Sequence, residues 1–250
     1  MDPFLVVLAG CRRSLPTKTK KINFYILIYN KAYCPPPILL SLYMAISVLA
    51  LGDSYTVGES LSWGESFPGQ LELLLATTCH PPFDKVSVRV VAKTGWTTDE
   101  LMGGIEEASP PLASCYDAVT LLIGVNNQYR GYCSSSYTGE FECLLKRAIA
   151  YAGDDPRRVI VLSIPDWGVT PFANAQGRNR VDISRQIDEF NVENMNVARR
   201  YNAEYINVTA WTREGATDPS LLAEDGLHPS GREYSRWAAV VCEKISRLQK

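Results

Sequence analysis

The sequence has few residues suited to binding a metal ion or building a disulfide framework. It has two histidines in 250 residues, and its seven cysteines form no C-x-x-C pair and no regular spacing. A zinc site needs closely spaced Cys and His ligands, so this composition argues against one. The odd, scattered cysteines favour free thiols in a reducing compartment. We expect no metal and no other cofactor.

Long apolar runs and an excess of positive charge are also missing. The longest apolar run, ILLSLYMAISVLAL, has 14 residues, which is too short to span a bilayer, so we expect no integral membrane span. Residues 51–250 carry 19 basic and 26 acidic side chains, although the first 50 residues are basic. Because an acidic body without a basic patch repels phosphate, we do not expect nucleic acid as a partner.

The first 43 residues show little beyond a basic run and the segment CPPP. We predict an N-terminal extension over 1–43 and one domain over 44–250, with Met44 as an alternative functional start. The segment FLVVLAGC, ending at Cys11, resembles a lipoprotein processing site, but no basic region precedes it and its apolar stretch is short. We therefore expect a cytoplasmic protein, with export or lipid anchoring through Cys11 as the alternative.

From residue 45 onward, apolar or β-branched runs alternate with segments of helical periodicity. The strand-like runs are AISVLALG, KVSVRVVA, DAVTLLIG, RRVIVLSIP and AEYINVT, a composition typical of buried strands. Helices are expected at about 64–78, 97–107, 137–152, 180–201 and 230–248. The alternation predicts an α/β fold with about five parallel strands covered on both faces, a three-layer α/β/α sandwich.

Polar and glycine-rich turns follow the predicted strands. They read GDSYTVG, KTGWTTDE, GVNNQYRG and PDWGVTPF, and the loop before the last helix reads EDGLHPSG. Parallel sheets place ligands and catalytic groups beyond the carboxyl ends of their strands. These turns are therefore the candidate functional site.

The first and last of these segments can supply a nucleophile and its base. A serine hydroxyl such as that of Ser54 needs a base within hydrogen-bonding reach and a group that orients the base. His228 is the credible base, because His80 precedes a predicted strand and falls at the other end of the sheet. Asp225 stands three residues before His228, so it can accept from one imidazole nitrogen and leave the other free for Ser54.

Acyl transfer also creates a negatively charged oxygen, which needs donors aimed at it. Three donors can converge: the backbone N–H of Ser54 at a helix start, the N–H of Gly95, and the side-chain amide of Asn126. Gly95 allows close approach of the backbone because it has no Cβ. Asn126 follows the third predicted strand.

Four short motifs together resemble the GDSL, or SGNH, hydrolases over about residues 45–245. They are Gly52-Asp53-Ser54, Gly95, Gly124-x-Asn126 and Asp225-x-x-His228. The resemblance implies a flavodoxin-like fold and hydrolysis of a small-molecule, lipid or carbohydrate ester through an acyl-enzyme. It implies Ser54 as nucleophile and oxyanion donor, Gly95 and Asn126 as further donors, His228 as base and Asp225 as its orienting acid.

Two positions depart from familiar patterns. Many members have Asp after the catalytic Asn, whereas this chain has Asn127, so a carboxylate is missing there. No glycine stands two residues after Ser54, which distinguishes the turn from the G-x-S-x-G elbow of α/β-hydrolases.

The residues leave several alternatives open. Ser54 can instead cap a helix, while Asp53 is expected to satisfy backbone donors in the turn. The GDSYTVG turn can cradle a phosphate or flavin without catalysis, and the same triad can transfer the acyl group to an alcohol. Arg130 and Asp166 can form an ion pair. The oligomeric state is not predicted. Trp96, Asn127, Tyr129 and Trp167 are expected to line a substrate pocket, and the three aromatic residues can equally cover the edge of the core.

Overall fold

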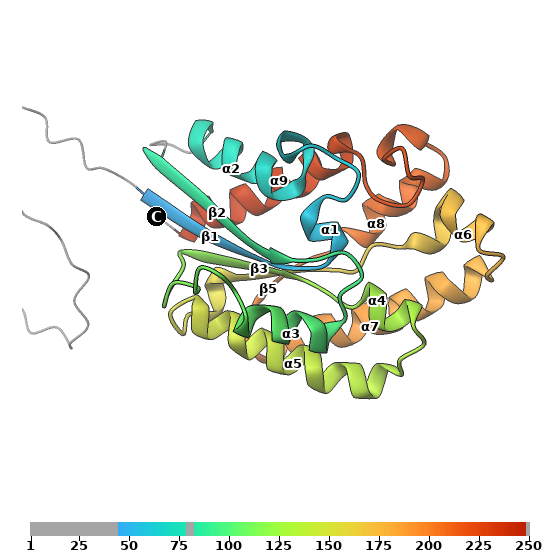
Figure 1. Cartoon of the computed structure of the whole chain (residues 1–250), viewed down its shortest axis with the longest axis horizontal. Coiled ribbons are helices and arrows are strands. Elements are labelled where there is room, and N and C mark those ends of the chain that lie inside the picture. The colour runs from blue at the N-terminus through green and yellow to red at the C-terminus, as the bar shows by residue number, and fades with distance from the viewer. Residues whose placement is uncertain (1–44, 79–82, 249–250) are drawn as a thin grey trace, which may run out of the picture. The chain divides into compact units, whose positions relative to one another are not determined.

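A computed structural model describes residues 45–78 and 83–248 (Figure 1). The predicted extension over 1–43, Cys11, Met44 and His80 lie outside the described residues. No helix in the described ranges is long and apolar enough to cross a membrane.

A five-stranded parallel sheet forms the middle layer and confirms the predicted fold class. Its strands are β1 (Ala45–Gly52), β2 (Lys85–Ala92), β3 (Ala118–Leu122), β4 (Val159–Leu162) and β5 (Glu204–Ile206). Their order is β2-β1-β3-β4-β5, and all four pairings are parallel. Every residue of β3 and β4 is buried, as expected for strands covered on both faces.

Long helices cover the two faces of the sheet. On one face lie α2 (Phe67–Thr77) and α9 (Gly231–Leu248), and on the other lie α3 (Thr98–Glu106), α5 (Ser134–Tyr151) and α7 (Arg180–Arg200) (Figure 1). The five predicted helices match these, with ends that differ by up to three residues. Helix α2 begins at residue 67 because the Ser66 hydroxyl accepts from the Gly69 N–H and Pro68 favours the first turn.

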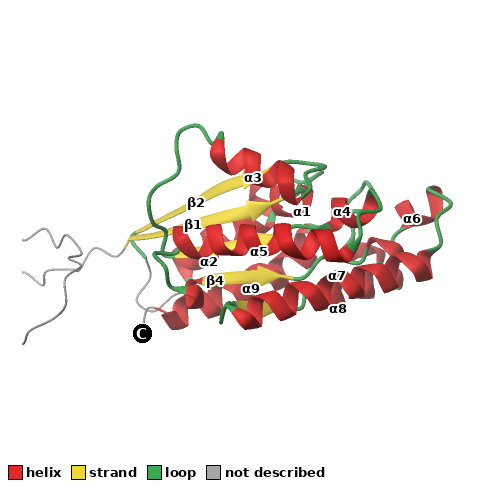
Figure 2. Ribbon diagram, turned by 90° about the horizontal axis from the view of Figure 1, so that it is seen from below, coloured by secondary structure: helices red, strands yellow, loops and turns green. Residues whose placement is uncertain are grey.

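Short helices connect the strands to the long helices. They are α1 (Ser54–Val57), α4 (Val125–Tyr129), α6 (Pro171–Ala175) and α8 (Thr209–Thr212), with 3₁₀ turns η1 (Trp63–Glu65), η2 (Pro156–Arg158), η3 (Trp167–Val169), η4 (Arg213–Ala216) and η5 (Pro219–Leu221). The strand arrowheads point toward α1, α4 and α6 (Figure 2). The chain segments that follow the strands therefore gather at one end of the sheet.

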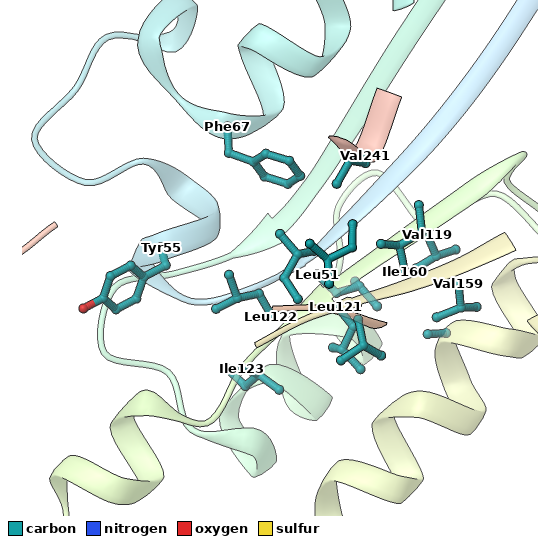
Figure 3. Close-up of a cluster of buried hydrophobic side chains, with 14 of the residues drawn as sticks. Leu51, Tyr55, Phe67, Val119, Leu121, Leu122, Ile123, Val159, Ile160 and Val241 are labelled. Atoms are coloured by element: carbon teal, nitrogen blue, oxygen red, sulfur yellow. The ribbon is translucent and has the colours of Figure 1, made fainter. Parts of the chain in front are cut away.

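The core joins the central strands to both helix layers. Leu51 of β1, Leu121 of β3 and Ile160 of β4 are completely buried and lie together, with Phe67 of α2 and Val241 of α9 on one side of them (Figure 3). Full burial of a side chain of this size contributes roughly 1.5–3 kcal/mol. This packing fixes the ends of β1 and β3, which carry the candidate site.

Candidate functional site

Ser54 is the first residue of α1, directly beyond β1. The N-cap of α1 is Asp53, whose Oδ1 accepts a hydrogen bond of 3.0 Å from the Tyr55 N–H. The alternative in which Ser54 caps the helix is therefore wrong, and Asp53 has the turn role expected for it. A Cβ on Gly52 would overlap the Thr56 side chain, so glycine is required where β1 meets α1.

Ser54, His228 and Asp225 form a continuous chain of hydrogen bonds. The Ser54 Oγ lies 2.9 Å from His228 Nε2, and His228 Nδ1 lies 2.6 Å from Asp225 Oδ2. Ser54 and His228 are each 5% exposed. The base, the hydroxyl and the orienting carboxylate expected from the sequence are thus brought together from positions 174 residues apart.

The loop before α9 holds Asp225 in its ionised form. Its Oδ1 accepts from the backbone N–H groups of Leu227 and His228, and its Oδ2 accepts from the Ser60 hydroxyl. Burial alone raises the pKa of Asp225, but the hydrogen bonds from His228, Leu227 and Ser60 outweigh it and lower the pKa to about 2. A carboxylate that stays charged favours an N–H on the facing imidazole nitrogen.

Asp53 is the second carboxyl group at this end of the sheet. It is completely buried, and its Oδ2 has no hydrogen-bond partner among the described residues. Burial raises its pKa to about 7, despite the hydrogen bond from the Tyr55 N–H. The N–H groups of Tyr55, Thr56 and Val57 all donate to Asp53, so α1 does not offer the set of free backbone N–H groups that binds a phosphate.

Gly95 lies in a tight turn between β2 and α3. The Trp96 N–H donates to the Lys93 carbonyl at 3.2 Å, and Gly95 has a φ of +87°. A hydrogen-bonded turn with positive φ at its third residue, and not at its second, is a type II turn, for which glycine is favoured. The side-chain Nδ2 of Asn126 donates to the Trp96 carbonyl at 2.9 Å and so ties this turn to α4.

A pocket of about 210 Å³ contains the proposed reacting groups. Ser54, Gly95, Asn126 and His228 line it together. The geometry therefore brings the candidate oxyanion donors to the same cavity as the candidate nucleophile and base.

Aromatic side chains form one wall of this pocket, and their rings pack edge to face. Trp167 lies 5.3 Å from Tyr129 and 6.1 Å from Phe172 between ring centroids. The Trp167 Nε1–H donates to Gln128 Oε1 at 2.7 Å, which fixes the indole. Tyr129 and Trp167 line the pocket. Phe172 was not selected from the sequence, although it ends the strand-end segment PDWGVTPF.

The sequence predicts Trp96 and Asn127 as pocket-lining residues, but neither lines the pocket. The Trp96 ring packs on α3, where a Cβ on Gly104 would overlap it. Asn127 is completely buried, and its amide accepts from the Thr98 N–H at 3.1 Å and donates to Thr98 Oγ1 at 2.7 Å. Both residues therefore support the loop and α3 behind the pocket.

A carboxylate also reaches this supporting site from another helix. The Thr98 hydroxyl donates to Glu140 of α5. Glu140 thus places a carboxyl group on the same hydroxyl that Asn127 bonds, and no sequence motif indicates this residue.

The predicted ion pair between Arg130 and Asp166 is wrong. Arg130 lies 3.2 Å from Glu100, whereas the buried Asp166 accepts from Arg213 Nε at 2.8 Å. Arg130 follows β3 and Asp166 follows β4, and their partners come from α3 and η4.

Within residues 45–78 and 83–248, no group of three or more His, Cys, Asp or Glu is arranged to hold a metal ion. The described side chains at the pocket offer one histidine and one orienting carboxylate, which bond to each other. Their chemistry is that of proton transfer to and from a hydroxyl.

Comparison with known proteins relates this geometry to a family. Residues 50–236 match the model of the GDSL-like lipase/acylhydrolase family. No protein of curated function matches the sequence significantly.

Solved structures share the fold at low identity. A lipase/acylhydrolase from Enterococcus faecalis is 19% identical with a TM-score of 0.61, covering 81% of this chain and 96% of that chain. The acetylxylan esterase Axe2 from Geobacillus stearothermophilus is 19% identical with a TM-score of 0.59, covering 81% and 95%. A G-D-S-L family lipolytic protein from Veillonella parvula is 17% identical with a TM-score of 0.58, covering 80% and 97%.

Proposed function

The chain belongs to the GDSL-like lipase/acylhydrolase family, and we propose that it hydrolyses carboxylic esters through an acyl-enzyme on Ser54. The observation that carries the proposal is the hydrogen-bonded chain from Ser54 through His228 to Asp225, in which Ser54 and His228 line a pocket. This is the arrangement that activates a serine hydroxyl in acyl transfer.

In the first half-reaction, His228 Nε2 takes the proton of Ser54 Oγ while Oγ bonds to the ester carbonyl carbon. The carbonyl oxygen becomes negative and accepts from the N–H groups of Ser54 and Gly95 and from the Asn126 amide. The carbon–oxygen bond to the alcohol then breaks, and the alcohol leaves with the proton from His228. Asp225 holds the imidazole in the required tautomer throughout.

In the second half-reaction, a water molecule gives a proton to His228 and its oxygen bonds to the acyl carbon. The bond to Ser54 Oγ breaks, and Ser54 regains the proton from His228. The products are the carboxylic acid, the alcohol and the free enzyme. An alcohol in place of water would instead complete a transfer, so product analysis with competing acceptors separates the two outcomes.

The size and lining of the pocket favour a short acyl group. A volume of about 210 Å³ is below the range of about 300–1,000 Å³ typical of sites for drug-sized ligands. Tyr129, Trp167 and Phe172 supply an apolar wall, which suits a small alkyl or acetyl group. We expect the ratio kcat/KM to fall as the acyl chain of an aryl ester is lengthened.

A short-chain aryl ester tests the proposal. The wild-type protein is expected to hydrolyse it, and Ser54→Ala is expected to lower kcat by a factor on the order of 10⁴ or more. Ser235→Ala is a matched control, since it removes an exposed serine hydroxyl of α9 that bonds the Arg232 carbonyl and no group of the candidate site. Equal rates for the wild type and Ser54→Ala would end the proposal.

A further inference from the structure

The turn that carries Gly95 is fastened to α4 by two side chains. Asn126, in the first turn of α4, donates to the Trp96 carbonyl at 2.9 Å, and Arg130, at the end of α4, donates from Nη2 to the Gly95 carbonyl at 2.7 Å. Asn126 belongs to a recognised motif, whereas nothing in the sequence singles out Arg130 for this role.

The orientation of one peptide group in this turn determines whether Gly95 can act as a donor. Type I and type II turns differ mainly in the direction of the central peptide, which here joins Thr94 to Gly95 and carries the Gly95 N–H. The Cβ position of Gly95 is open, with Arg130 Nη2 at 3.9 Å as its nearest neighbour. Packing at Gly95 itself therefore does not fix this peptide, and hydrogen bonds must hold it.

Arg130 is itself held in place by α3. The nitrogen that bonds Gly95 also lies 3.2 Å from Glu100 Oε2, and the same oxygen accepts from the Thr97 N–H at 2.9 Å. Glu100 thus caps the start of α3 and also forms an ion pair with Arg130, the residue that bonds the Gly95 carbonyl. This connects the start of α3, the turn and the end of α4 in one network beside the pocket.

We propose that Arg130 is a positioning residue of the oxyanion site, which holds the Gly95 carbonyl so that the Gly95 N–H faces the pocket. The inference rests on the ester hydrolysis proposed above. Arg130 acts through Gly95 and does not touch the substrate. Its loss misdirects one donor in the transition state and leaves the apolar pocket that binds the ground state unchanged.

The test compares Arg130→Met with Arg147→Met. Methionine keeps most of the side-chain stem but no donor. Arg147 makes a similar exposed ion pair to α3, with Glu106 at 3.4 Å, and its side chain is 45% exposed against 42% for Arg130. The two variants therefore lose comparable surface pairs, and only one of them contacts the turn.

We expect Arg130→Met to lower kcat about tenfold, less than removal of a whole oxyanion donor, with KM changed less than twofold. It should weaken binding of an alkyl boronic acid, which forms a tetrahedral adduct on serine, by a similar factor. Arg130→Lys should recover part of the loss, and Arg147→Met should match the wild type in both measurements.

The possible results separate this inference from the proposed function. If the wild type is active and Ser54→Ala is not, but Arg130→Met retains full kcat and boronic acid affinity, the role of Arg130 is refuted and the esterase proposal stands. An equal loss in Arg147→Met would also refute it, because the effect would then belong to α3 as a whole. If the wild type itself does not hydrolyse esters, the proposed function fails first.

Discussion

Asp53 and Asp225 show how the surroundings of a residue set its charge. Both carboxyl groups lie within a few residues of the candidate reacting groups, yet burial raises the pKa of Asp53 to about 7, and hydrogen bonds lower that of Asp225 to about 2. The two carboxyl groups differ because Asp225 accepts four hydrogen bonds, whereas Asp53 leaves one buried oxygen without a partner. Their protonation states therefore differ near neutral pH.

The raised pKa of Asp53 predicts a pH dependence of stability. Its folded pKa lies above the unfolded value near 3.9, so its neutral form is favoured in the folded protein and its stabilising effect is lost as the pH rises from about 4 through 7. Asn resembles the neutral carboxyl group and is also a good N-cap. Asp53→Asn should therefore gain stability relative to the wild type as the pH rises, by up to about 4 kcal/mol.

Urea unfolding of both proteins at pH 5 and pH 8 measures this difference. The free energy of unfolding of Asp53→Asn minus that of the wild type should increase between the two pH values. A difference that is constant, or that shrinks toward pH 8, would show that Asp53 is ionised in the folded protein at both pH values.

The sequence allowed the Ser54, His228 and Asp225 combination to be predicted because the relevant information is local. Asp225 and His228 are three residues apart in a glycine-containing loop. Ser54 directly follows a predicted strand, which places it at the end of the sheet where catalytic groups are expected. The contacts of Asn127 and Arg130 could not be predicted in this way. Their partners Thr98, Glu100 and Gly95 belong to another turn, and only the packing of α4 beside it brings them together.

At the scale of elements, α3 and α5 share the polar group around Thr98. Asn127 of α4 donates to the Thr98 hydroxyl, which in turn donates to Glu140 of α5. Asn127→Asp would place two carboxylates on one hydroxyl in a buried site, so we expect it to destabilise the protein by about 1–3 kcal/mol. Adding Glu140→Gln removes one charge and supplies a donor, and the double variant should recover most of the loss.

A double-mutant cycle of chemical unfolding measures this coupling. The single variant Glu140→Gln serves as the internal control and should cost less than Asn127→Asp. Additive effects of the two substitutions would contradict the account, because they would show that Asn127 and Glu140 do not act on the same hydroxyl.

The length of a helix decides whether it could be predicted from the periodicity of the sequence. Helices α5, α7 and α9 run for 18, 21 and 18 residues, long enough for an amphipathic repeat to be recognised. Helices α1, α4 and α6 have four or five residues, which is little more than one turn and shows no repeat. Phe172, which belongs to α6, could not be predicted as a pocket residue for the same reason.

At the scale of the whole molecule, the alternation of strands and helices predicts a parallel sheet because parallel neighbours need helical crossovers. The order β2-β1-β3-β4-β5 does not follow from the runs themselves, since any buried strand has a similar composition. The resemblance to a family of known fold supplied the flavodoxin-like expectation that the residues alone could not.

Strand β1, which lies between β2 and β3, is expected to carry much of the stability of the fold. Leu51 is completely buried where β1 meets α2, α9 and β3, so Leu51→Ala should cost about 2–5 kcal/mol in chemical unfolding. Leu73→Ala on α2 is the matched control, because Leu73 is 61% exposed and should change stability by less than about 0.5 kcal/mol. Similar losses of unfolding free energy in the two variants would mean that the packing in Figure 3 does not dominate the stability of the fold.

The central claim is that Ser54 is a nucleophile activated by His228. Labelling with a fluorophosphonate, followed by mass spectrometric mapping of the modified peptide, tests it most directly. We predict one label per chain on Ser54 in the wild type, no label in Ser54→Ala, and a rate lowered by a factor on the order of 10³ or more in His228→Ala. A label on another residue, or an unchanged labelling rate in His228→Ala, would contradict the account.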